Sequence, residues 1–398
     1  MADPDLPEPA LPEPDRLGDG LPEPDLREPD LPRTAKVRPK ALRTGWTTGT
    51  CASAAAKAAA ALLAQGPPSP SWVEVGLPSG RRVTFAVEEA GMVDGAARAV
   101  VVKDAGDDPD VTHGARLTAT VAWHPGTGVE LAGGEGVGVV TKPGLGLPVG
   151  GPAINPVPRA MISQAVAEVV GERGVRVVIS VPDGERMARK TTNRRLGVLD
   201  GISILGTTGI VRPFSTASWR ASVVQAVRVA AAQGQRTIVL CTGGRTEKGA
   251  MGLMPDLPEV CFIEVGDFTG AALRTAVEQG VTRVVFVGMV GKLTKLAAGV
   301  LMTHYTRSAV DTTLLGRLTL ACGGGPDLVA EVGAANTARH AYELWAGAGM
   351  LRPAGDGLCQ RVRQVLTRFT GGSVGAEVAM VDFTGRTVVA ATVGEWLR

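Results

Sequence analysis

The sequence predicts an α/β protein with two domains: an N-terminal α/β domain and a second domain built on a parallel sheet, both preceded by a disordered acidic, proline-rich tail. The chain has 398 residues, which is enough for two hydrophobic cores. Between residues 237 and 301, apolar runs alternate with helical segments, as is typical of a parallel sheet with helices on both faces. Residues 1–32 repeat an LPEP-like unit, and a segment so rich in proline and acid forms no packed core.

These observations define the expected boundaries. The tail covers residues 1–40, and the N-terminal α/β domain, with its glycine- and proline-rich loops, covers 41–200. The parallel-sheet domain covers 201–350, and a C-terminal helix and β-hairpin cover 351–398.

The net charge of +2 conceals an uneven distribution. The first 32 residues contain ten acidic and two basic side chains and so carry −8, which leaves +10 on the rest of the chain. A basic body attracts anionic partners. The sequence has no Lys/Arg stripes with interleaved aromatic residues, which are typical of nucleic-acid-binding proteins. We therefore expect a small polyanion as the ligand and no nucleic acid partner.

Cysteine usage and hydropathy indicate a cytoplasmic protein. The five cysteines are scattered without CxxC spacing, which favours a reducing compartment and argues against a thiolate metal site. No apolar run reaches the roughly 18 residues that a membrane-spanning helix needs, and the acidic N-terminus is unlike a signal peptide. We expect no membrane partner, and a homo-oligomer is compatible with the sequence.

The N-terminal half is expected to begin with a helix. The alanine-rich stretch 52–64 follows threonines and glycines that can cap a helix, and such an N-terminus can bind an anion. Periodicity and turn residues predict the elements that follow. These are a hairpin of 72–75 with 82–87, strands at 99–102, 115–123 and 175–181, helices at 159–171 and 183–191, and a strand within 196–211.

A charged loop follows the strand at 99–102. It contains a lysine, four aspartates and a histidine without helical or strand spacing: Lys103, Asp104, Asp107, Asp108, Asp110 and His113. Such a loop carries either binding chemistry or only Asx turns at the surface. Its oxygen atoms would suit Mg²⁺ or Ca²⁺, but the spacing does not match an EF-hand loop, and we expect no dedicated metal site.

The segment 130–158 is a second irregular stretch. It is too rich in glycine and proline for regular structure, yet its apolar residues favour burial. A long irregular segment within a domain is usually functional, and the alternative is an interdomain linker.

The C-terminal half alternates strands with helices. The expected strands are 237–241, 260–265 and 281–287, and the expected helices are 216–233, 247–253, 269–279, 292–301, 311–321, 328–346 and 357–369, with a hairpin over 376–392. Glycine-containing turns follow the three strands at 242–245, 266–268 and 288–292. Because ligands bind parallel sheets at the carboxyl ends of the strands, these turns predict a small-molecule cleft.

Common nucleotide-binding and metalloprotease motifs are absent. The chain has no GxxxxGK[ST] or HExxH, and the GGEGVG at 133–138 precedes no predicted helix. Cys51 lies at a helix N-terminus, where a thiol can be acidified, but a small buried residue is the preferred interpretation. His304 could transfer protons near neutral pH or be a structural hydrogen-bonding residue.

Five long, irregular motifs occur in one chain: RTGWTTGTCASAAAKAA (43–59), VVKDAGDDPDVTHGA (101–115), GEGVGVVTKPGLGLPVGGPAINPVPR (134–159), LGVLDGISILGTTGIVRP (196–213) and VGMVGKLTKLAAGVLMTH (287–304). Together they closely resemble the CbiD family, the cobalt-precorrin-5B (C1)-methyltransferases. Beyond His304 the resemblance is weaker, and the acidic tail is an addition to the family pattern. Trp46 stands where the family more often has Tyr.

The resemblance implies transfer of a methyl group from S-adenosylmethionine to C1 of cobalt-precorrin-5B, giving cobalt-precorrin-6A in cobalamin synthesis. Cobalt would enter only as part of the substrate. The resemblance also implies that the second domain is Rossmann-like. The basic body suits a tetrapyrrole with many carboxylates, and the parallel-sheet cleft suits the adenosine part of the donor.

Motif membership and residue chemistry then predict the site. We expect the donor at the strand ends, with Asp267 as ribose ligand by analogy with dinucleotide sites: Thr242, Gly243, Gly244, Asp267 and Gly288. We expect the tetrapyrrole against a second set, with Lys292 near the boundary: Arg43, Thr47, Thr48, Lys103, Lys142, Arg159 and Lys292. Asp104 and His304 are the candidates for catalytic proton handling.

Two other classes of function remain open. One is a nucleotide-dependent α/β enzyme such as a dehydrogenase, which the missing fingerprint disfavours. The other is a non-catalytic tetrapyrrole-binding protein on the same scaffold. Nucleotide binding without donor binding would indicate the first class, and tight tetrapyrrole binding without donor affinity would indicate the second.

Overall fold

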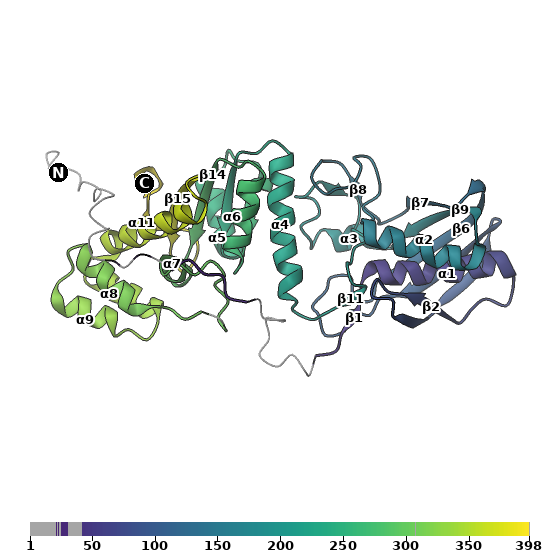
Figure 1. Ribbon diagram of the computed structural model, residues 1–398, viewed down its shortest axis with the longest axis horizontal. Coiled ribbons are helices and arrows are strands. Elements are labelled where there is room, and N and C mark those ends of the chain that lie inside the picture. The colour runs from purple at the N-terminus through teal and green to yellow at the C-terminus, as the bar shows by residue number, and fades with distance from the viewer. Residues whose placement is uncertain (1–20, 22, 24, 31–41, 307, 398) are drawn as a thin grey trace. The chain divides into compact units, whose positions relative to one another are not determined.

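The computed structural model describes residues 21, 23, 25–30, 42–306 and 308–397 (Figure 1). The chain divides into two compact units, residues 33–219 and residues 220–398 together with 1–32. Both units mix helices with strands, in agreement with the expected α/β class. None of the helices in the described part of the chain is long and apolar enough to cross a membrane.

The first unit, residues 33–219, is built on a five-stranded sheet in the order β4-β5-β6-β9-β7. The first four strands are antiparallel neighbours: β4 (Glu89–Val93), β5 (Ala96–Val102), β6 (Arg116–Thr127) and β9 (Arg173–Ser180). The fifth, β7 (Val129–Gly133), runs parallel to β9. The prediction located β5, β6 and β9 but missed β4 and β7, because few of their residues are buried and they show no apolar pattern. The predicted hairpin is confirmed as β2 (Trp72–Gly76) with β3 (Arg82–Ala86).

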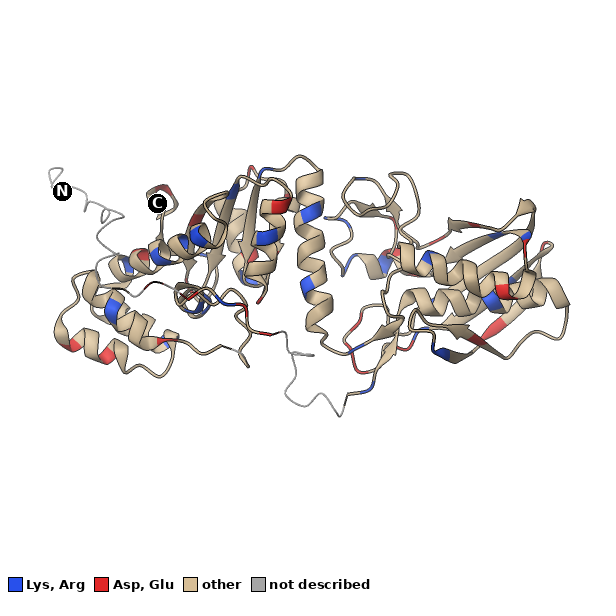
Figure 2. Ribbon diagram, viewed as in Figure 1, with Lys and Arg blue, Asp and Glu red and all other residues tan. Residues whose placement is uncertain are grey.

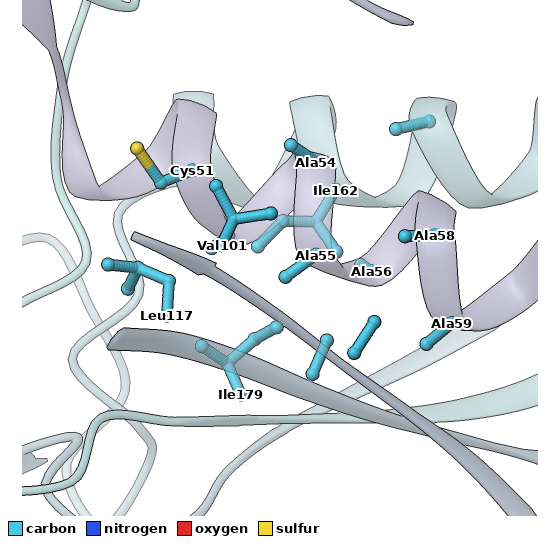
Figure 3. Packing of buried hydrophobic residues seen from close by; sticks show 14 of the residues in the cluster. Cys51, Ala54, Ala55, Ala56, Ala58, Ala59, Val101, Leu117, Ile162 and Ile179 are labelled. Carbon is cyan, nitrogen blue, oxygen red and sulfur yellow. The ribbon is translucent and has the colours of Figure 1, made fainter. Parts of the chain in front are cut away.

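Helices α1 (Thr48–Gln65) and α2 (Pro156–Val170) lie side by side and pack against this sheet. Figure 3 shows the alanines of α1 facing Leu117 and Ile179 of the strands and Ile162 of α2. Alanine has only a methyl group, so the helix approaches the sheet closely without leaving voids. The predicted alanine-rich helix is therefore confirmed, and it supplies much of the buried core of this unit.

The predicted strand within 196–211 is wrong. Only two short pairings occur there: β10 (Val198–Leu199) with β8 (Val139–Val140), and β11 (Ile210–Val211) with β1 (Gly45–Trp46). Positive φ angles at Asp200, Gly206 and Gly209 turn the backbone away from an extended path. These pairings tie the segment to the first unit, which extends to residue 219 rather than 200. The short helix α3 (Gly184–Ala188) lies within the predicted range.

The second unit contains the predicted parallel sheet. Its strand order is β13-β12-β14-β15-β16, with β13 (Phe262–Glu264), β12 (Thr237–Cys241), β14 (Arg283–Gly288) and β15 (Gly375–Val381) parallel and β16 (Val388–Ala391) antiparallel at the edge. Because β13 and β14 flank β12 on opposite sides, right-handed crossovers place α5 (Gly244–Leu253) and α6 (Thr269–Glu278) on opposite faces. The C-terminal hairpin continues this same sheet, because β15 pairs with β14.

The other helices of the second unit lie near their predicted positions, with one difference. They are α4 (Thr216–Ala232), which spans the boundary between the units, α7 (Val290–Ala297), α8 (Thr312–Ala321) and α11 (Leu351–Phe369). The single helix predicted at 328–346 is two helices, α9 (Pro326–Gly333) and α10 (Ala338–Gly347). The Thr337 hydroxyl accepts a hydrogen bond from the His340 N–H (3.1 Å), and this N-cap starts the second helix.

The expectation of a disordered tail over 1–40 falls mostly outside the described residues. The part that is described contacts the second unit. The Arg27 N–H donates to Gly299 O (3.1 Å), and the Leu301 N–H donates to Arg27 O (2.9 Å). Glu28 forms an ion pair with Arg274. For residues 25–30 the structure therefore shows a docked segment, because backbone hydrogen bonds replace the core that the composition lacks.

Candidate functional site

One end of the first unit gathers its irregular segments. Strands β5 and β9 both run antiparallel to β6, and β7 runs parallel to β9, so the carboxyl ends of β5, β7 and β9 share one end of the sheet. The Trp46 N–H, just before α1, donates to Asp104 O (2.7 Å) after β5, and the Gly134 N–H donates to Ile179 O (2.8 Å) in β9. The short pairs β1–β11 and β8–β10 lie at this end (Figure 1).

Arg43 and the aspartate loop form the centre of this cluster. The Arg43 guanidinium pairs with Asp104, and its backbone N–H donates to Asp107 Oδ2 (2.6 Å). A Cβ atom on Gly45 would lie 2.1 Å from the Ala105 carbonyl carbon, so only glycine permits this close approach. The structure therefore brings together Arg43, predicted to bind substrate, and Asp104, predicted to be catalytic.

Asp104 is a carboxylate with a lowered pKa. The hydrogen bond from Arg43 lowers it most, followed by the N–H of Gly106, which lies 2.9 Å from Oδ1. Asp104 is therefore ionised near neutral pH, and the same contacts weaken it as a base. His113 lies in the same loop, with Nδ1 3.8 Å from Asp104 Oδ1, and that nitrogen accepts a hydrogen bond from the Ala105 N–H (3.1 Å). His113 was not among the predicted site residues, although its position in the loop motif was the available signal.

Lys103 lies beneath this loop instead of facing solvent. Its side chain is 1% exposed, and Nζ lies 2.6 Å from Asp110 Oδ2. Asp110 also accepts hydrogen bonds from the N–H and hydroxyl of Thr112 (2.7 and 2.6 Å). Burial alone would raise the pKa of Asp110, but Lys103 and Thr112 hold it below its ordinary value. The ammonium group of Lys103, predicted to bind substrate, therefore pairs with Asp110 and stabilises the loop.

Thr47 and Thr48 are also buried and bonded within the fold. Thr47 is the N-cap of α1 and accepts a hydrogen bond from the Thr50 N–H (3.2 Å). The Thr48 hydroxyl accepts from the Leu205 N–H (2.9 Å). These contacts attach the start of α1 to the 205–209 segment, so two of the residues predicted to bind substrate fix the position of the loops.

Lys142 and Arg159 are the more accessible cations of the predicted set. Lys142 is exposed and its stem packs against Gly197, where an added Cβ would lie 2.6 Å from the Lys142 Cβ. Arg159 lies in the first turn of α2 and is half-buried. Neither side chain forms an ion pair with any residue that the structure describes. Both charges can therefore meet an anionic ligand.

In the second unit, the predicted donor residues lie at adjacent strand ends. Gly288 ends β14 beside Thr242, which follows β12, and a Cβ on Gly288 would lie 3.3 Å from the Thr242 Cγ2. Gly243 is the N-cap of α5, and the Thr246 hydroxyl donates to its carbonyl (2.7 Å). Gly244 begins α5 and is exposed. The structure thus brings Thr242, Gly243 and Gly288 together, as the strand pattern predicts.

Asp267, Lys292 and Thr303 form a hydrogen-bonded triangle. Lys292 pairs with Asp267 Oδ1, the Thr303 hydroxyl donates to the same oxygen (3.1 Å), and Lys292 Nζ lies 2.9 Å from Thr303 Oγ1. Asp267 Oδ2 accepts no hydrogen bond from any described residue. A predicted donor ligand and a predicted substrate ligand therefore share one cluster, and Thr303 is a member that was not predicted.

His304 follows this triangle directly. It is 3% exposed, and its Nδ1 lies 2.8 Å from the Thr306 hydroxyl. The Ser308 hydroxyl donates to its carbonyl oxygen (3.0 Å). The exposed Tyr305 ring lies 4.7 Å from the imidazole. His304 is thus held by its neighbours and lies next to the cluster that contains Asp267.

The structure does not suggest a thiol nucleophile at Cys51. Burial raises the pKa of its thiol to about 12, so the nucleophilic thiolate is scarce at neutral pH. Among the residues that the structure describes, no group of three or more His, Cys, Asp or Glu side chains could hold a metal ion.

Comparison with known proteins gives the following relatives. A protein of Salinispora arenicola named cobalt-precorrin-5B C(1)-methyltransferase is 71% identical over 370 residues, covering 92% of this chain and 97% of its own. Proteins of the same name from Rubrobacter xylanophilus and Methylococcus capsulatus are 62% and 50% identical, covering 91% and 87% of this chain and 94% and 92% of theirs. The crystal structure of the cobalamin biosynthesis protein (cbiD) from Archaeoglobus fulgidus is 28% identical, covers 77% of this chain and 85% of that chain, and has a TM-score of 0.35.

Family comparison covers both units. The family described as CbiD matches residues 35–213, which include the aspartate loop and the start of α1. The family described as CbiD, C-terminal domain, matches residues 302–392, which include Thr303 and His304. The relatives align along nearly their whole lengths. With both family regions present in order, this chain belongs to the CbiD family.

Proposed function

We propose that this protein transfers a methyl group from S-adenosylmethionine to C1 of cobalt-precorrin-5B, giving cobalt-precorrin-6A in cobalamin synthesis. The observation that carries the proposal is the set of relatives named cobalt-precorrin-5B C(1)-methyltransferase, which are 46–71% identical and align with at least 87% of this chain. The alignments span both units of this chain and at least 92% of each of these relatives.

The carboxyl-end cluster of the first unit suits the tetrapyrrole. Arg43, Lys142 and Arg159 are cations that can meet its carboxylates, although Arg43 also holds Asp104. Thr47, Thr48 and Lys103 bond to the protein itself, so we assign them to positioning the loops that contact the substrate.

The strand ends of the second unit suit the donor. Gly243 and Gly244 place backbone without side chains at the start of α5, where a ligand can approach the backbone closely. Asp267 uses Oδ1 for Lys292 and Thr303, which supports our assignment of Oδ2 to a ribose hydroxyl of the donor. Lys292 then orients the carboxylate that contacts the donor.

The reaction needs alignment of the reactants and a group that takes up a proton. S-adenosylmethionine supplies a methyl group already activated on a sulfonium; a carbon–carbon bond forms at C1 as the sulfur–methyl bond breaks. Alignment by the protein can contribute about 7–11 kcal/mol. The methylated macrocycle gains one positive charge, and loss of a proton removes it. We assign proton handling to Asp104 and His304; Asp104 is ionised, but its contact with Arg43 lowers its pKa and makes it a weak base.

Anaerobic incubation with S-adenosylmethionine and cobalt-precorrin-5B, followed by mass spectrometry, tests the proposal. The expected result is a tetrapyrrole that has gained one methyl group at C1. If no methyl group is gained while a known family member is active in parallel, tight binding of the tetrapyrrole would indicate a carrier. Binding of a nucleotide without binding of S-adenosylmethionine would indicate a nucleotide-dependent enzyme.

Asp267→Ala tests the donor site separately. We expect the Kd for S-adenosylmethionine to rise about 10- to 100-fold, because a hydrogen bond to a charged group contributes about 1.5–3 kcal/mol. Isothermal titration calorimetry measures the change. Asp256→Ala, at an exposed position in the same unit, is the matched control and should bind the donor as wild type does. Unchanged donor affinity in D267A would remove Asp267 from the site.

A further inference from the structure

In the first unit, β8 and β10 form an antiparallel ribbon with one buried face and one exposed face. Val140 pairs with Val198, and Val139 pairs with Leu199. Directly opposed residues of an antiparallel pair point to the same side of the ribbon. Val140 and Val198 therefore share the inner side, where they belong to a small buried cluster. Val139 and Leu199 share the outer side and are 37% and 38% exposed.

This outer pair is held on a well-packed support. The Thr141 N–H donates to Gly197 O (2.7 Å), and the Gly138 N–H donates to Ile202 O (2.9 Å). A Cβ on Gly138 would lie 2.3 Å from Val198 Cγ1, so the two chain segments touch at the backbone. The apolar pair is thus presented in a preformed position, which lowers the entropy cost of binding a ligand.

Cations flank the ribbon. Lys142 follows β8, and its stem packs against Gly197 just before β10. The Gly197 N–H donates to Arg194 O (3.1 Å), and Lys190 precedes that turn. The side chains of Lys142, Lys190 and Arg194 are exposed, and none forms an ion pair with a residue in the described part of the chain.

The acidic residues nearby do not neutralise these cations. Asp183 pairs with Arg186 (3.2 Å), and Glu185 pairs with Arg189 (3.0 Å). Asp200, next to Leu199, and Glu135, before β8, are exposed carboxylates near the ribbon, and the three exposed cations outnumber them. The surface therefore combines an apolar pair with an excess of positive charge.

We propose that the outer face of the β8–β10 ribbon is the subsite for one apolar face of the tetrapyrrole macrocycle. Val139 and Leu199 contact the ring, while Lys142, Lys190 and Arg194 receive the carboxylates around its rim. The assignment rests on the proposed methyltransferase function and names where its substrate binds. A flat ring with apolar faces and an anionic rim matches both parts of this surface.

The size of the patch favours this ligand over a macromolecule. Stable protein interfaces bury about 800 Å² on each partner, far more than two half-exposed side chains can supply. Proteins that bind single-stranded nucleic acids stack the bases on aromatic side chains. The outer face of this ribbon has only the aliphatic side chains of Val139 and Leu199.

The double variant V139S/L199S tests the subsite. We expect the KM for cobalt-precorrin-5B to rise about tenfold, because the lost apolar contact corresponds to about 1.4 kcal/mol. The kcat and the KM for S-adenosylmethionine should stay within about twofold of wild type. Val93→Ser and Leu320→Ser remove apolar side chains that are 50% and 61% exposed elsewhere, and both controls should leave the KM unchanged.

A binding assay separates this inference from the proposed function. Fluorescence titration with uroporphyrin III, a tetrapyrrole with a rim of carboxylates, should give a Kd about tenfold higher for V139S/L199S than for wild type or the controls. The K142E/R194E variant should bind more weakly still at low salt. Wild-type Kd and KM in V139S/L199S, with wild type methylating normally, would overturn the subsite and leave the function standing. Binding that depends on the ribbon in a protein that methylates nothing would refute the function and support the subsite.

Discussion

At the scale of single residues, Lys103 shows how burial changes the role of a charge. The sequence places it in a charged loop, where a cation for an anionic substrate is a reasonable interpretation. The structure leaves 1% of its side chain exposed and pairs it with Asp110. Removing an ammonium group from water costs several kcal/mol, and only a close anion offsets that cost. The ammonium group of Lys103 therefore stabilises the loop by pairing with Asp110, whereas the Arg43 guanidinium remains exposed to solvent.

Replacing Lys103 with Met should destabilise the protein. Asp110 would remain as a half-buried carboxylate without its cation, and we expect the free energy of unfolding to fall by about 3 kcal/mol. Urea denaturation measures this loss. Lys190→Met, at an exposed lysine, is the control and should stay within about 0.5 kcal/mol of wild type. A loss in K103M no larger than in the control would mean that the pair does not stabilise the loop.

At the scale of elements, Glu168 joins three parts of the first unit. It lies on α2, pairs with Lys57 of α1, and accepts hydrogen bonds from Arg82 of β3 (3.1 and 2.9 Å). Arg82 contributes most and Lys57 next to lowering the pKa of Glu168 from 4.5 to about 2. One carboxylate thus connects the two helices and the hairpin, and it stays ionised at pH values well below 4.5.

This connection predicts an acid-dependent loss of stability. Because the pKa of Glu168 is lower in the folded state, its contribution is fully present above pH 4.5 and disappears as the pH falls towards 2. Thermal melts of wild type and Glu168→Gln across this range should show a smaller dependence of Tm on pH in the variant. Glu172→Gln, at an exposed carboxylate in the same unit, should keep the wild-type slope. Equal slopes for E168Q and wild type would refute the prediction.

The docked tail segment, residues 25–30, also joins elements that are far apart in the sequence, because Arg27 bonds to the turn at 299–301. The Leu301 N–H donates to Arg27 O, and elsewhere in the same unit the Gly375 N–H donates to Thr282 O (2.9 Å). Deleting residues 1–30 removes the acceptor of the Leu301 N–H and keeps the acceptor of the Gly375 N–H. We expect amide hydrogen exchange to accelerate at Leu301 and to stay near wild type at Gly375. If Leu301 exchanged at the wild-type rate after the deletion, the segment would not protect this turn in solution.

At the scale of the whole molecule, charge is divided between the tail and the body. The first 32 residues carry −8 and the remainder +10. In the described part of the chain, Lys and Arg are spread over both units instead of forming one stripe (Figure 2). A field of this kind attracts a small polyanion and is screened within about 8–10 Å at ordinary ionic strength.

Salt should therefore weaken capture of the tetrapyrrole. We expect the KM for cobalt-precorrin-5B to rise severalfold between 50 and 300 mM NaCl, as is usual for electrostatically steered association, while kcat changes little. The KM for S-adenosylmethionine, which carries a positive sulfonium, is the internal control and should not rise. A tetrapyrrole KM that is independent of salt would contradict a role for the basic body.

Predictions from the sequence agreed with the structure where residues close together in the chain determine whether a helix or a strand forms. The alanine run makes α1, Thr47 caps it, and alternating apolar runs make the parallel strands of the second unit. The predictions failed where no local signal exists. Strands β4 and β7 bury few residues, and the apolar run at 196–211 is bent by Asp200 and glycines into separate short pairings.

The sequence by itself determined the family, the class of reaction and most of the helices and strands, because motifs and periodicity depend on residues close together in the chain. Only the tertiary structure decided which charges meet. Arg43 reaches Asp104, and Asp267 is shared by Lys292 and Thr303, through contacts between distant segments. The burial of Lys103 also depends on contacts between distant segments, because residues from several parts of the first unit cover its side chain. The partner and the exposure of a side chain, and hence its chemistry, are set by packing that local sequence does not encode.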